Sequence, residues 1–365
     1  MVPVRILHCI PHLMGGGAER QLCYLAMHQA DCGHDVHVAF LAGSDVPATL
    51  ESSSVRLHPI AHRRTHDPTI LLRLVQLMRT LRPDIVQTCL LQMDILGGLA
   101  ARLTRTPWLL REPNGRYFWP DNWKARLRLL MARSASAIVS NSASGDSYWQ
   151  HHLPAVQRFI VHNGVPIDAI AAESAVPHEQ LGLAPGTPVI LCACRLEPNK
   201  NVETLVRALA CVCERLPATA LICGQGSQHA PLARLIETLG AGTTIRLAGY
   251  RNDIWPLMKT ARLFVSTSTT EGNPNSVLEA MASHCPIVLS DIPAHREMLD
   301  TNSAFFVEHY NDADSIAGVI VDALANPAES SRRSDAAYRR IVSRSIAGMA
   351  GQYDKVYAAA LAGAG

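Results

Sequence analysis

Short apolar runs alternate with amphipathic stretches along the chain, and this alternation restricts the fold more than any other sequence feature. In the first half, five apolar runs have the length of strands, and each is separated from the next by a longer segment with the apolar periodicity of a helix. Strands that alternate with helices form parallel βαβ units. The sequence therefore predicts a doubly wound α/β domain whose strands lie near residues 4–10, 37–42, 84–88, 136–140 and 159–162.

A second series of the same kind follows a break. The motif at residues 163–166 and a polar, Ala/Pro-rich stretch to residue 187 interrupt the alternation, and 365 residues are enough for two domains. Beyond it, strands are expected near residues 188–193, 220–223, 244–247, 263–266, 287–289 and 304–307. We predict two doubly wound, Rossmann-like domains, 1–166 and 167–344, followed by a C-terminal helix within 345–365.

The segment Glu271-Gly-Asn-Pro-Asn-Ser-Val-Leu-Glu279 is the most informative motif. It joins an apparent buried strand to an apolar helix, with one carboxylate before the Gly/Pro-broken loop and the other in the first turns of the helix. Backbone N–H groups of such a loop and helix start hold phosphate, whereas a carboxylate would repel phosphate and suits hydroxyl donors. Phosphate together with hydroxyls indicates a nucleotide sugar; a loop acid plus a helix acid without a ligand is the alternative.

Two cations follow an earlier strand of the second series. Arg195 stands directly after the strand, and Lys200 precedes a helix that begins near Asn201, whose side chain is expected to cap it. An arginine fork and a lysine point charge beside a helix N-terminus suit a diphosphate. The alternative is an ordinary loop arginine and a solvated lysine.

Glycines also follow strands in both halves. Gly224 and Gly226 come after the strand near 220–223 and permit close backbone approach or a tight turn. Three successive glycines, 15–17, open the first helix, where they permit contact with a ligand or make a flexible turn. A dinucleotide site is not predicted, because the Gly-x-Gly-x-x-Gly spacing and the acid after the second strand are absent.

Charge is spread unevenly. Residues 1–165 carry 17 Lys/Arg against 11 Asp/Glu, and the remainder carries 16 against 20. Within the basic half, residues 123–133 read as a helix with Trp123, Leu127, Leu130 and Met131 on one side and Lys124, Arg126, Arg128 and Arg133 between them. Such a helix either contacts an anionic membrane or packs its apolar side on its own sheet. Nucleic acid is not an expected partner, since aromatic residues make up 5% and no dense basic run occurs.

Several motifs in this order resemble those of GT-B-fold retaining glycosyltransferases, glycosyltransferase family 4 (group 1). The similarity covers most of the chain. It rests on the segments 15–20, 140–144, 162–165, 195–201, 224–226, 247–253 and 271–282.

The resemblance implies roles for individual residues. Arg195 and Lys200 would bind the donor diphosphate and act in catalysis with Glu271, which would contact the transferred sugar. Glu279 would take the ribose hydroxyls, and the last helix would cross back to the first domain. The further donor-binding positions are Gly15, Gly16, Gly17, Gly224, Gly226, Tyr250, Gly272, Asn273, Asn275 and Ser276.

The first domain departs from the family pattern. Where many relatives have a histidine after the strand that ends near Leu110, this chain has Arg111 and Glu112. These two residues either bind an acceptor or pair with each other.

The resemblance, taken with these features, implies a metal-independent hexosyltransferase without a cofactor, which moves a sugar from a UDP- or GDP-linked donor to a hydroxyl acceptor. The expected setting is bacterial polysaccharide or lipid-linked glycan synthesis in the cytoplasm, with peripheral contact at the inner face of the membrane. A nucleotide-sugar epimerase or hydrolase on the same fold and a non-catalytic nucleotide-sugar-binding protein are the alternatives. No segment has the roughly 18 uninterrupted apolar residues of a membrane span.

Overall fold

The computed structural model describes residues 3–13, 16–64, 67–116 and 118–363. The chain forms two compact units. Unit 1 comprises Met1–Gly164 together with Arg344–Gly365, and unit 2 comprises Val165–Ser343.

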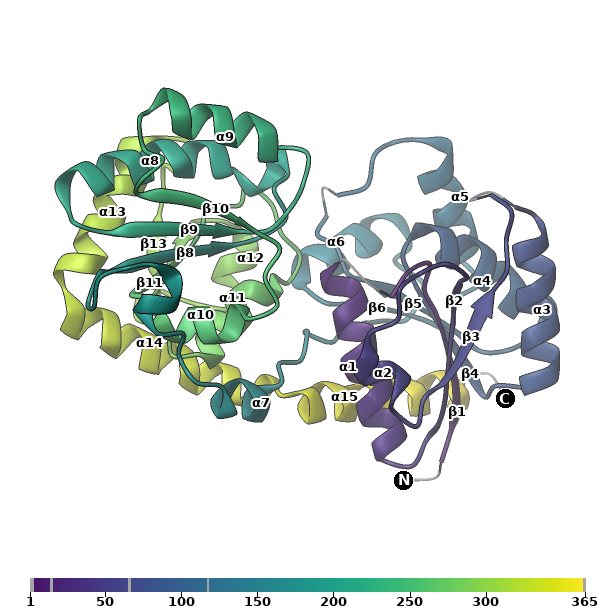
Figure 1. Ribbon diagram of the computed structural model, residues 1–365. Coiled ribbons are helices and arrows are strands. Elements are labelled where there is room, and N and C mark those ends of the chain that lie inside the picture. The colour runs from purple at the N-terminus through teal and green to yellow at the C-terminus, as the bar shows by residue number, and fades with distance from the viewer. Residues whose placement is uncertain (1–2, 14–15, 65–66, 117, 364–365) are drawn as a thin grey trace. The chain divides into compact units, whose positions relative to one another are not determined.

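Unit 1 contains a seven-stranded parallel sheet with the order β3-β2-β1-β4-β5-β6-β7 (Figure 1). The strands are β1 (Arg5–Cys9), β2 (Asp35–Leu41), β3 (Arg56–Ile60), β4 (Ile85–Cys89), β5 (Trp108–Glu112), β6 (Ala137–Ser140) and β7 (Arg158–Ile160). The order reverses direction between β1 and β4, as in a doubly wound sheet. All its pairings are parallel, as the alternation of strands and helices predicts.

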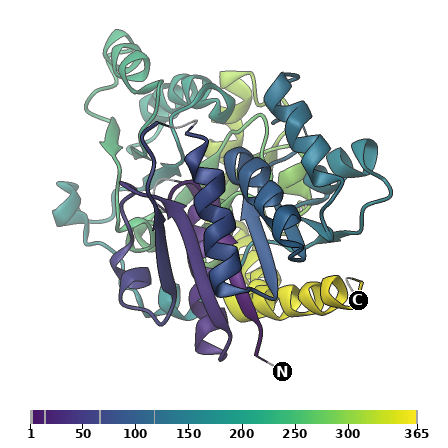
Figure 2. The ribbon, with the colours of Figure 1, turned by 90° about the vertical axis from the view of Figure 1, so that its right-hand side faces the viewer.

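Helices cover both faces of this sheet. The helices of unit 1 are α1 (Gly17–Asp31), α2 (Ala48–Glu51), α3 (Thr69–Leu81), α4 (Leu91–Thr104), α5 (Trp123–Ala132), α6 (Ala143–His152) and α15 (Ile346–Ala362). Helices α3 to α6 bury their apolar sides against one face, and α1 and α15 cover the other. Figure 2 shows α15, in yellow, running along the sheet.

A buried polar chain anchors α15. The Tyr357 hydroxyl donates to Gln87 Oε1 at 2.8 Å and accepts from Gln29 Nε2 at 3.0 Å, and Gln29 Oε1 lies 2.8 Å from His8 Nε2. Burial lowers the pKa of His8 to about 4, so this imidazole is neutral at physiological pH. The last helix is thus tied to α1, β1 and β4 by neutral hydrogen bonds within the core.

Unit 2 contains a six-stranded parallel sheet with the order β10-β9-β8-β11-β12-β13. Its strands are β8 (Val189–Ala193), β9 (Thr219–Cys223), β10 (Ile245–Gly249), β11 (Leu263–Ser266), β12 (Ile287–Ser290) and β13 (Phe305–Val307). Its α-helices are α7 (Ile167–Ala172), α8 (Val202–Arg215), α9 (His229–Thr238), α10 (Ile254–Thr260), α11 (Asn275–Ala282), α12 (Pro293–Arg296), α13 (Ala313–Ala325) and α14 (Pro327–Ile341). Short 3₁₀ turns are η1 (His178–Leu181), η2 (Pro198–Lys200) and η3 (Val342–Arg344), which spans the unit boundary.

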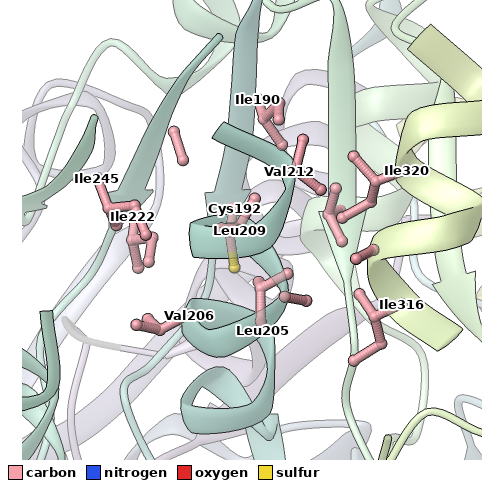
Figure 3. Packing of buried hydrophobic residues seen from close by; sticks show 14 of the residues in the cluster. Ile190, Cys192, Leu205, Val206, Leu209, Val212, Ile222, Ile245, Ile316 and Ile320 are labelled. Atoms are coloured by element: carbon pink, nitrogen blue, oxygen red, sulfur yellow. The ribbon is translucent and has the colours of Figure 1, made fainter. Parts of the chain in front are cut away.

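The core of unit 2 has two layers. Helices α8, α9 and α13 pack on one face of the sheet, where Leu205, Leu209 and Ile316 share one buried cluster with the strand residues Ile190 and Ile222 (Figure 3). Helices α7, α10, α11 and α14 pack on the other face. The predicted α/β class with two doubly wound sheets is therefore confirmed.

Two features of unit 1 differ from the sequence predictions. Strand β3 is not predicted, because its residues are mostly polar or partly exposed and it pairs only with β2 at the sheet edge. Helix α5 forms as expected, but the predicted division into an apolar and a basic side is wrong. Arg128 is only 1% exposed, whereas Trp123 is 69% exposed and Leu130 is 51% exposed.

Arg128 is buried because it completes an ion network. It donates to Asp94 Oδ2 at 2.6 Å and to Glu112 Oε2 at 2.8 Å, and its guanidinium lies against the rings of Trp119 and Trp149.

Within the described residues, no helix has both the length and the apolar composition needed to cross a bilayer.

Candidate active site

The loops after four strands of unit 2 are hydrogen-bonded to one another at the carboxyl edge of the sheet. Gly224 N donates to Gly249 O at 2.7 Å, which joins the ends of β9 and β10. Leu196 N, after β8, donates to Gln225 O at 2.9 Å, and Thr269 N, after β11, donates to Asn199 O at 2.9 Å. Ligands of open parallel sheets bind at this edge.

Gly224 and Gly226 allow the loop after β9 to press against the loop that carries Arg195. A Cβ atom at Gly224 would lie 1.8 Å from Cys194 O, and one at Gly226 would lie 2.4 Å from Leu196 O. Gly224 also has φ +138°, a conformation that side chains rarely adopt. The close backbone approach predicted for these glycines is thus an approach to the backbone at Cys194 and Leu196. This packing holds the Arg195 loop in place.

Lys200 and Glu271 form an ion pair. Lys200 Nζ lies 2.5 Å from Glu271 Oε1, although the residues are 71 positions apart. Ser268 Oγ donates to the same carboxylate oxygen at 2.7 Å, and Ser290 Oγ donates to Ser268 O at 2.5 Å. Two strand ends, those of β11 and β12, therefore hold the Glu271 carboxylate beside the Lys200 ammonium.

Helix α11 begins at Asn275, directly after the Glu271 loop, and its N-cap residue is Pro274, which gives no side-chain cap hydrogen bond. Asn275 and Ser276 lie in its first turn, and the next two backbone N–H groups, those of Val277 and Leu278, donate to Pro274 O at 3.2 and 3.3 Å. Gly272 and the buried Asn273 precede the helix, and Glu279 is buried within it. An uncapped helix start next to a lysine provides a positive electrostatic field for an anion.

Arg195 and Tyr250 are exposed at the same edge of the sheet. Among the residues that the structure describes, Arg195 has no ion-pair or side-chain hydrogen-bond partner. Its guanidinium is free to take an anionic ligand.

The predicted helix cap at Asn201 is wrong. Asn201 occupies the N-cap position of α8, but in the left-handed conformation and without a side-chain cap hydrogen bond. Its Nδ2 donates to Tyr310 O at 2.7 Å, and its Oδ1 accepts from Thr204 Oγ1 at 2.7 Å. The side chain ties η2 to the loop after β13, which helps to fix the turn that carries Lys200.

In unit 1, the glycine loop is described only in part. Gly16 occupies the N-cap position of α1 and Gly17 begins the helix, whereas Gly15 lies outside the described residues. A Cβ at Gly16 would lie 2.4 Å from Glu19 Oε2, so the glycine leaves room for that carboxylate.

Arg111 and Glu112 do not pair with each other, contrary to one of the two alternatives. They are consecutive on β5, so their side chains lie on opposite faces of the sheet. Arg111 NH2 donates to Asn163 Oδ1 at 3.3 Å, whereas Glu112 binds Arg128 and accepts from Trp119 Nε1 at 2.8 Å. Both side chains are buried, and their acceptor role stays a prediction.

Sequence reasoning missed the residues that support Glu271. Ser268 belongs to a run of hydroxyl residues after β11, a signal that was available in the sequence. Ser290 and His295 gave no such signal, because they lie on a different strand and helix. His295 Nδ1 lies 2.8 Å from Ser290 O, and burial lowers the pKa of this fully buried imidazole.

Comparisons with known proteins agree with this geometry. The family described as "Glycosyl transferases group 1" matches residues 175–340, and the family described as "Glycosyltransferase Family 4" matches residues 15–169. The UDP-Gal:alpha-D-GlcNAc-diphosphoundecaprenol alpha-1,3-galactosyltransferase of Escherichia coli is 25% identical over 270 residues, 70% of each chain. The lipopolysaccharide core mannosyltransferase LpcC of Rhizobium leguminosarum is 26% identical over 224 residues, 58% of this chain and 60% of its own.

Solved structures show the same fold. HepE of Anabaena, crystallised with UDP-glucose, superposes with a TM-score of 0.87 at 20% identity and covers 97% of this chain and 99% of its own. The two sheets and these matches define a GT-B-fold glycosyltransferase. The chain belongs to the group 1 glycosyltransferases, glycosyltransferase family 4.

Proposed function

We propose that the enzyme transfers a hexose from a UDP-linked donor to a hydroxyl of a lipid-linked glycan, with retention of anomeric configuration. The observation that carries the proposal is the Lys200–Glu271 pair, placed beside the unpartnered Arg195 and the uncapped start of α11. UDP rather than GDP is supported by the UDP-glucose bound to HepE and by the UDP-Gal donor of the Escherichia coli relative.

Each of these groups has a role in the transfer. When the bond between the anomeric carbon and the diphosphate oxygen breaks, negative charge grows on the leaving diphosphate. Arg195, Lys200 and the amides of the first turn of α11 stabilise this charge where it develops, without a metal ion. Positive charge grows on the sugar ring, and the Glu271 carboxylate balances it once the diphosphate has taken Lys200 as a partner.

The remaining donor contacts follow from the same edge. Glu279 lies in α11, about one turn after Asn275, and accepts hydrogen bonds from the ribose hydroxyls. Tyr250, exposed after β10, borders the base. Backbone around Gly272, Asn273 and Asn275 contacts the phosphate or the sugar.

The acceptor side is proposed from unit 1. The Escherichia coli relative acts on a diphosphoundecaprenol-linked sugar, and α5 exposes Trp123 and Leu130 together with Arg126 and Arg133. Aromatic, apolar and basic side chains on one helix face suit the interface of an anionic membrane. We propose that α5 contacts the membrane in which such an acceptor is embedded.

Nucleotide binding tests the donor site directly. Thermal unfolding is followed with UDP, GDP, ADP or NAD, because a ligand at about 100 times its Kd adds roughly 2.7 kcal/mol to the native state. UDP is expected to raise the melting temperature of the wild type and of Arg215→Gln, whose arginine is exposed at the far end of α8. The shift is expected to be lost in Arg195→Gln, Lys200→Met and Glu279→Gln. A UDP shift that survives all three substitutions would place the nucleotide elsewhere.

A further inference from the structure

A cavity of about 260 Å³ lies in unit 1 at the carboxyl ends of α4 and α5, away from the carboxyl edge of the sheet. Its polar lining consists of Arg102, Arg105, Thr106, Ser134 and Ser136. None of the residues assigned to sugar transfer belongs to this lining, so the cavity needs an explanation of its own.

Arginine side chains give the cavity a positive charge. Arg102 and Arg105 are exposed, as is Arg133, one residue before Ser134. In the part of the chain that the structure describes, none of these three arginines has an ion-pair or side-chain hydrogen-bond partner. The helix ends contribute a partial negative charge of roughly half a unit each, which three guanidinium groups outweigh.

Ser134 Oγ donates to Met131 O at 2.8 Å, so the hydroxyl that can complete the set of donors is that of Ser136. Ser136 Oγ accepts from Trp108 N at 3.3 Å, so its own proton remains available to a ligand. Arginine forks together with a hydroxyl donor are the groups that proteins use to bind phosphate. A volume of this size exceeds what a bare inorganic phosphate occupies and accepts a substituted phosphate.

An apolar side chain lies beside the cavity on α5, and another is exposed elsewhere on α4. Leu103, between the two cavity arginines, is 56% exposed, and Leu130, one helical turn before Ser134, is 51% exposed. On α5 the exposed residues Trp123, Leu130 and Arg133 follow helical spacing, so they lie on one face that leads to the cavity. A charged pocket next to a helix face that exposes Trp123 and Leu130 fits a phosphate that is attached to acyl chains.

We infer that the cavity binds the phosphodiester headgroup of an anionic phospholipid and that Leu130 enters the adjoining acyl region. This inference rests on the membrane contact proposed for α5. Trp123 at the start of the helix and the headgroup pocket at its end lie about 15 Å apart along the axis. Two anchors at that separation hold α5 parallel to the membrane surface.

The test compares the wild type with two double variants of equal net charge in vesicle co-sedimentation, using full-length chain with phosphatidylglycerol-containing or pure phosphatidylcholine vesicles. The variants are Arg102→Gln/Arg105→Gln in the pocket and Arg215→Gln/Arg234→Gln, which removes two exposed cations of unit 2. Each surface cation contributes roughly fivefold to the affinity for an anionic surface. The pocket variant is expected to bind phosphatidylglycerol vesicles roughly 30-fold more weakly, with little change in the unit 2 variant and little binding of any protein to phosphatidylcholine.

Other outcomes separate the possible failures. Equal losses in the two double variants would mean that only net charge matters, and the headgroup pocket would be rejected. Loss of binding in Trp123→Ala/Leu130→Ala but not in the pocket variant would leave the membrane contact standing and reject the pocket. Soluble glycerol phosphate that protects Arg102 and Arg105 from phenylglyoxal, without any vesicle binding, would identify a free-phosphate site instead. Absence of vesicle binding by the wild type would overturn both membrane proposals, while UDP-induced stabilisation would still report on the donor site.

Discussion

Replacing Arg128 by methionine removes the one cation of the buried network in unit 1. The guanidinium donates to Asp94 Oδ2 at 2.6 Å and to Glu112 Oε2 at 2.8 Å, and all three side chains are buried. Methionine keeps an apolar stem between Trp119 and Trp149, so the main loss is electrostatic. Removing one partner of a buried ion pair costs about 3–5 kcal/mol, and because two carboxylates lose their partner here, we expect the upper part of that range at pH 8.

The loss depends on pH with a definite sign. Burial raises the pKa of Asp94 from 3.8 to about 6 even with Arg128 present. A carboxyl whose folded-state pKa is raised binds an extra proton in the folded state, so stability falls as pH rises from about 4 to about 6, by about 3 kcal/mol in the wild type. Without Arg128 the folded-state pKa rises further, and the falling stability continues above pH 6. The variant is therefore expected to lose less at pH 5 than at pH 8.

Urea unfolding followed by tryptophan fluorescence measures this effect, because four of the five tryptophans, at positions 108, 119, 123 and 149, belong to unit 1. Arg126→Met is the matched control on the same helix, since Arg126 pairs with Asp121 at the surface, where solvent screens the pair and its contribution to stability is small. If Arg128→Met loses no more stability than Arg126→Met, or loses the same amount at pH 5 and pH 8, the electrostatic reasoning is refuted.

Two further substitutions test the packing around the donor site and the last helix. Gly224→Ala places a Cβ against Cys194 O and must displace the Arg195 loop. A shift of about 1 Å is expected to lower the transfer rate in a steady-state assay roughly 10²-fold. The control Gly242→Ala, whose Cβ would enter open space, is expected to leave the rate unchanged. Tyr357→Phe removes the hydroxyl that bonds the buried side chains of Gln29 and Gln87. Urea unfolding should show a free energy of unfolding lower by about 1–3 kcal/mol. An unchanged unfolding midpoint would mean that the polar chain does not anchor α15.

The alternation of apolar runs and amphipathic segments predicts both parallel sheets, because a strand buried on both faces must be apolar throughout. The same rule explains why β3 was missed, since an edge strand can remain polar. Helix α5 was placed correctly but oriented wrongly. Its periodicity does not reveal that Asp94 and Glu112, distant in sequence, draw Arg128 into the core.

The candidate site shows the same division. The sequence placed Arg195, Lys200 and the Glu271 loop after strand ends, and carboxyl ends of parallel strands meet at one edge of a sheet. The pairing of Lys200 with Glu271 and the support from Ser268 could not be predicted, since they depend on how two loops pack. The roles of these residues in transfer remain predictions.

The most direct test of the central claim is product formation. The wild type, Lys200→Met and Arg215→Gln are each incubated with UDP-linked hexoses and a panel of lipid-linked sugar acceptors. The products are separated and identified by mass spectrometry. We predict one new glycosidic product, formed with stoichiometric release of UDP by the wild type and by Arg215→Gln, and formed at least 10²-fold more slowly by Lys200→Met. If the wild type yields only free or isomerised sugar across the whole panel, the enzyme is not the proposed transferase.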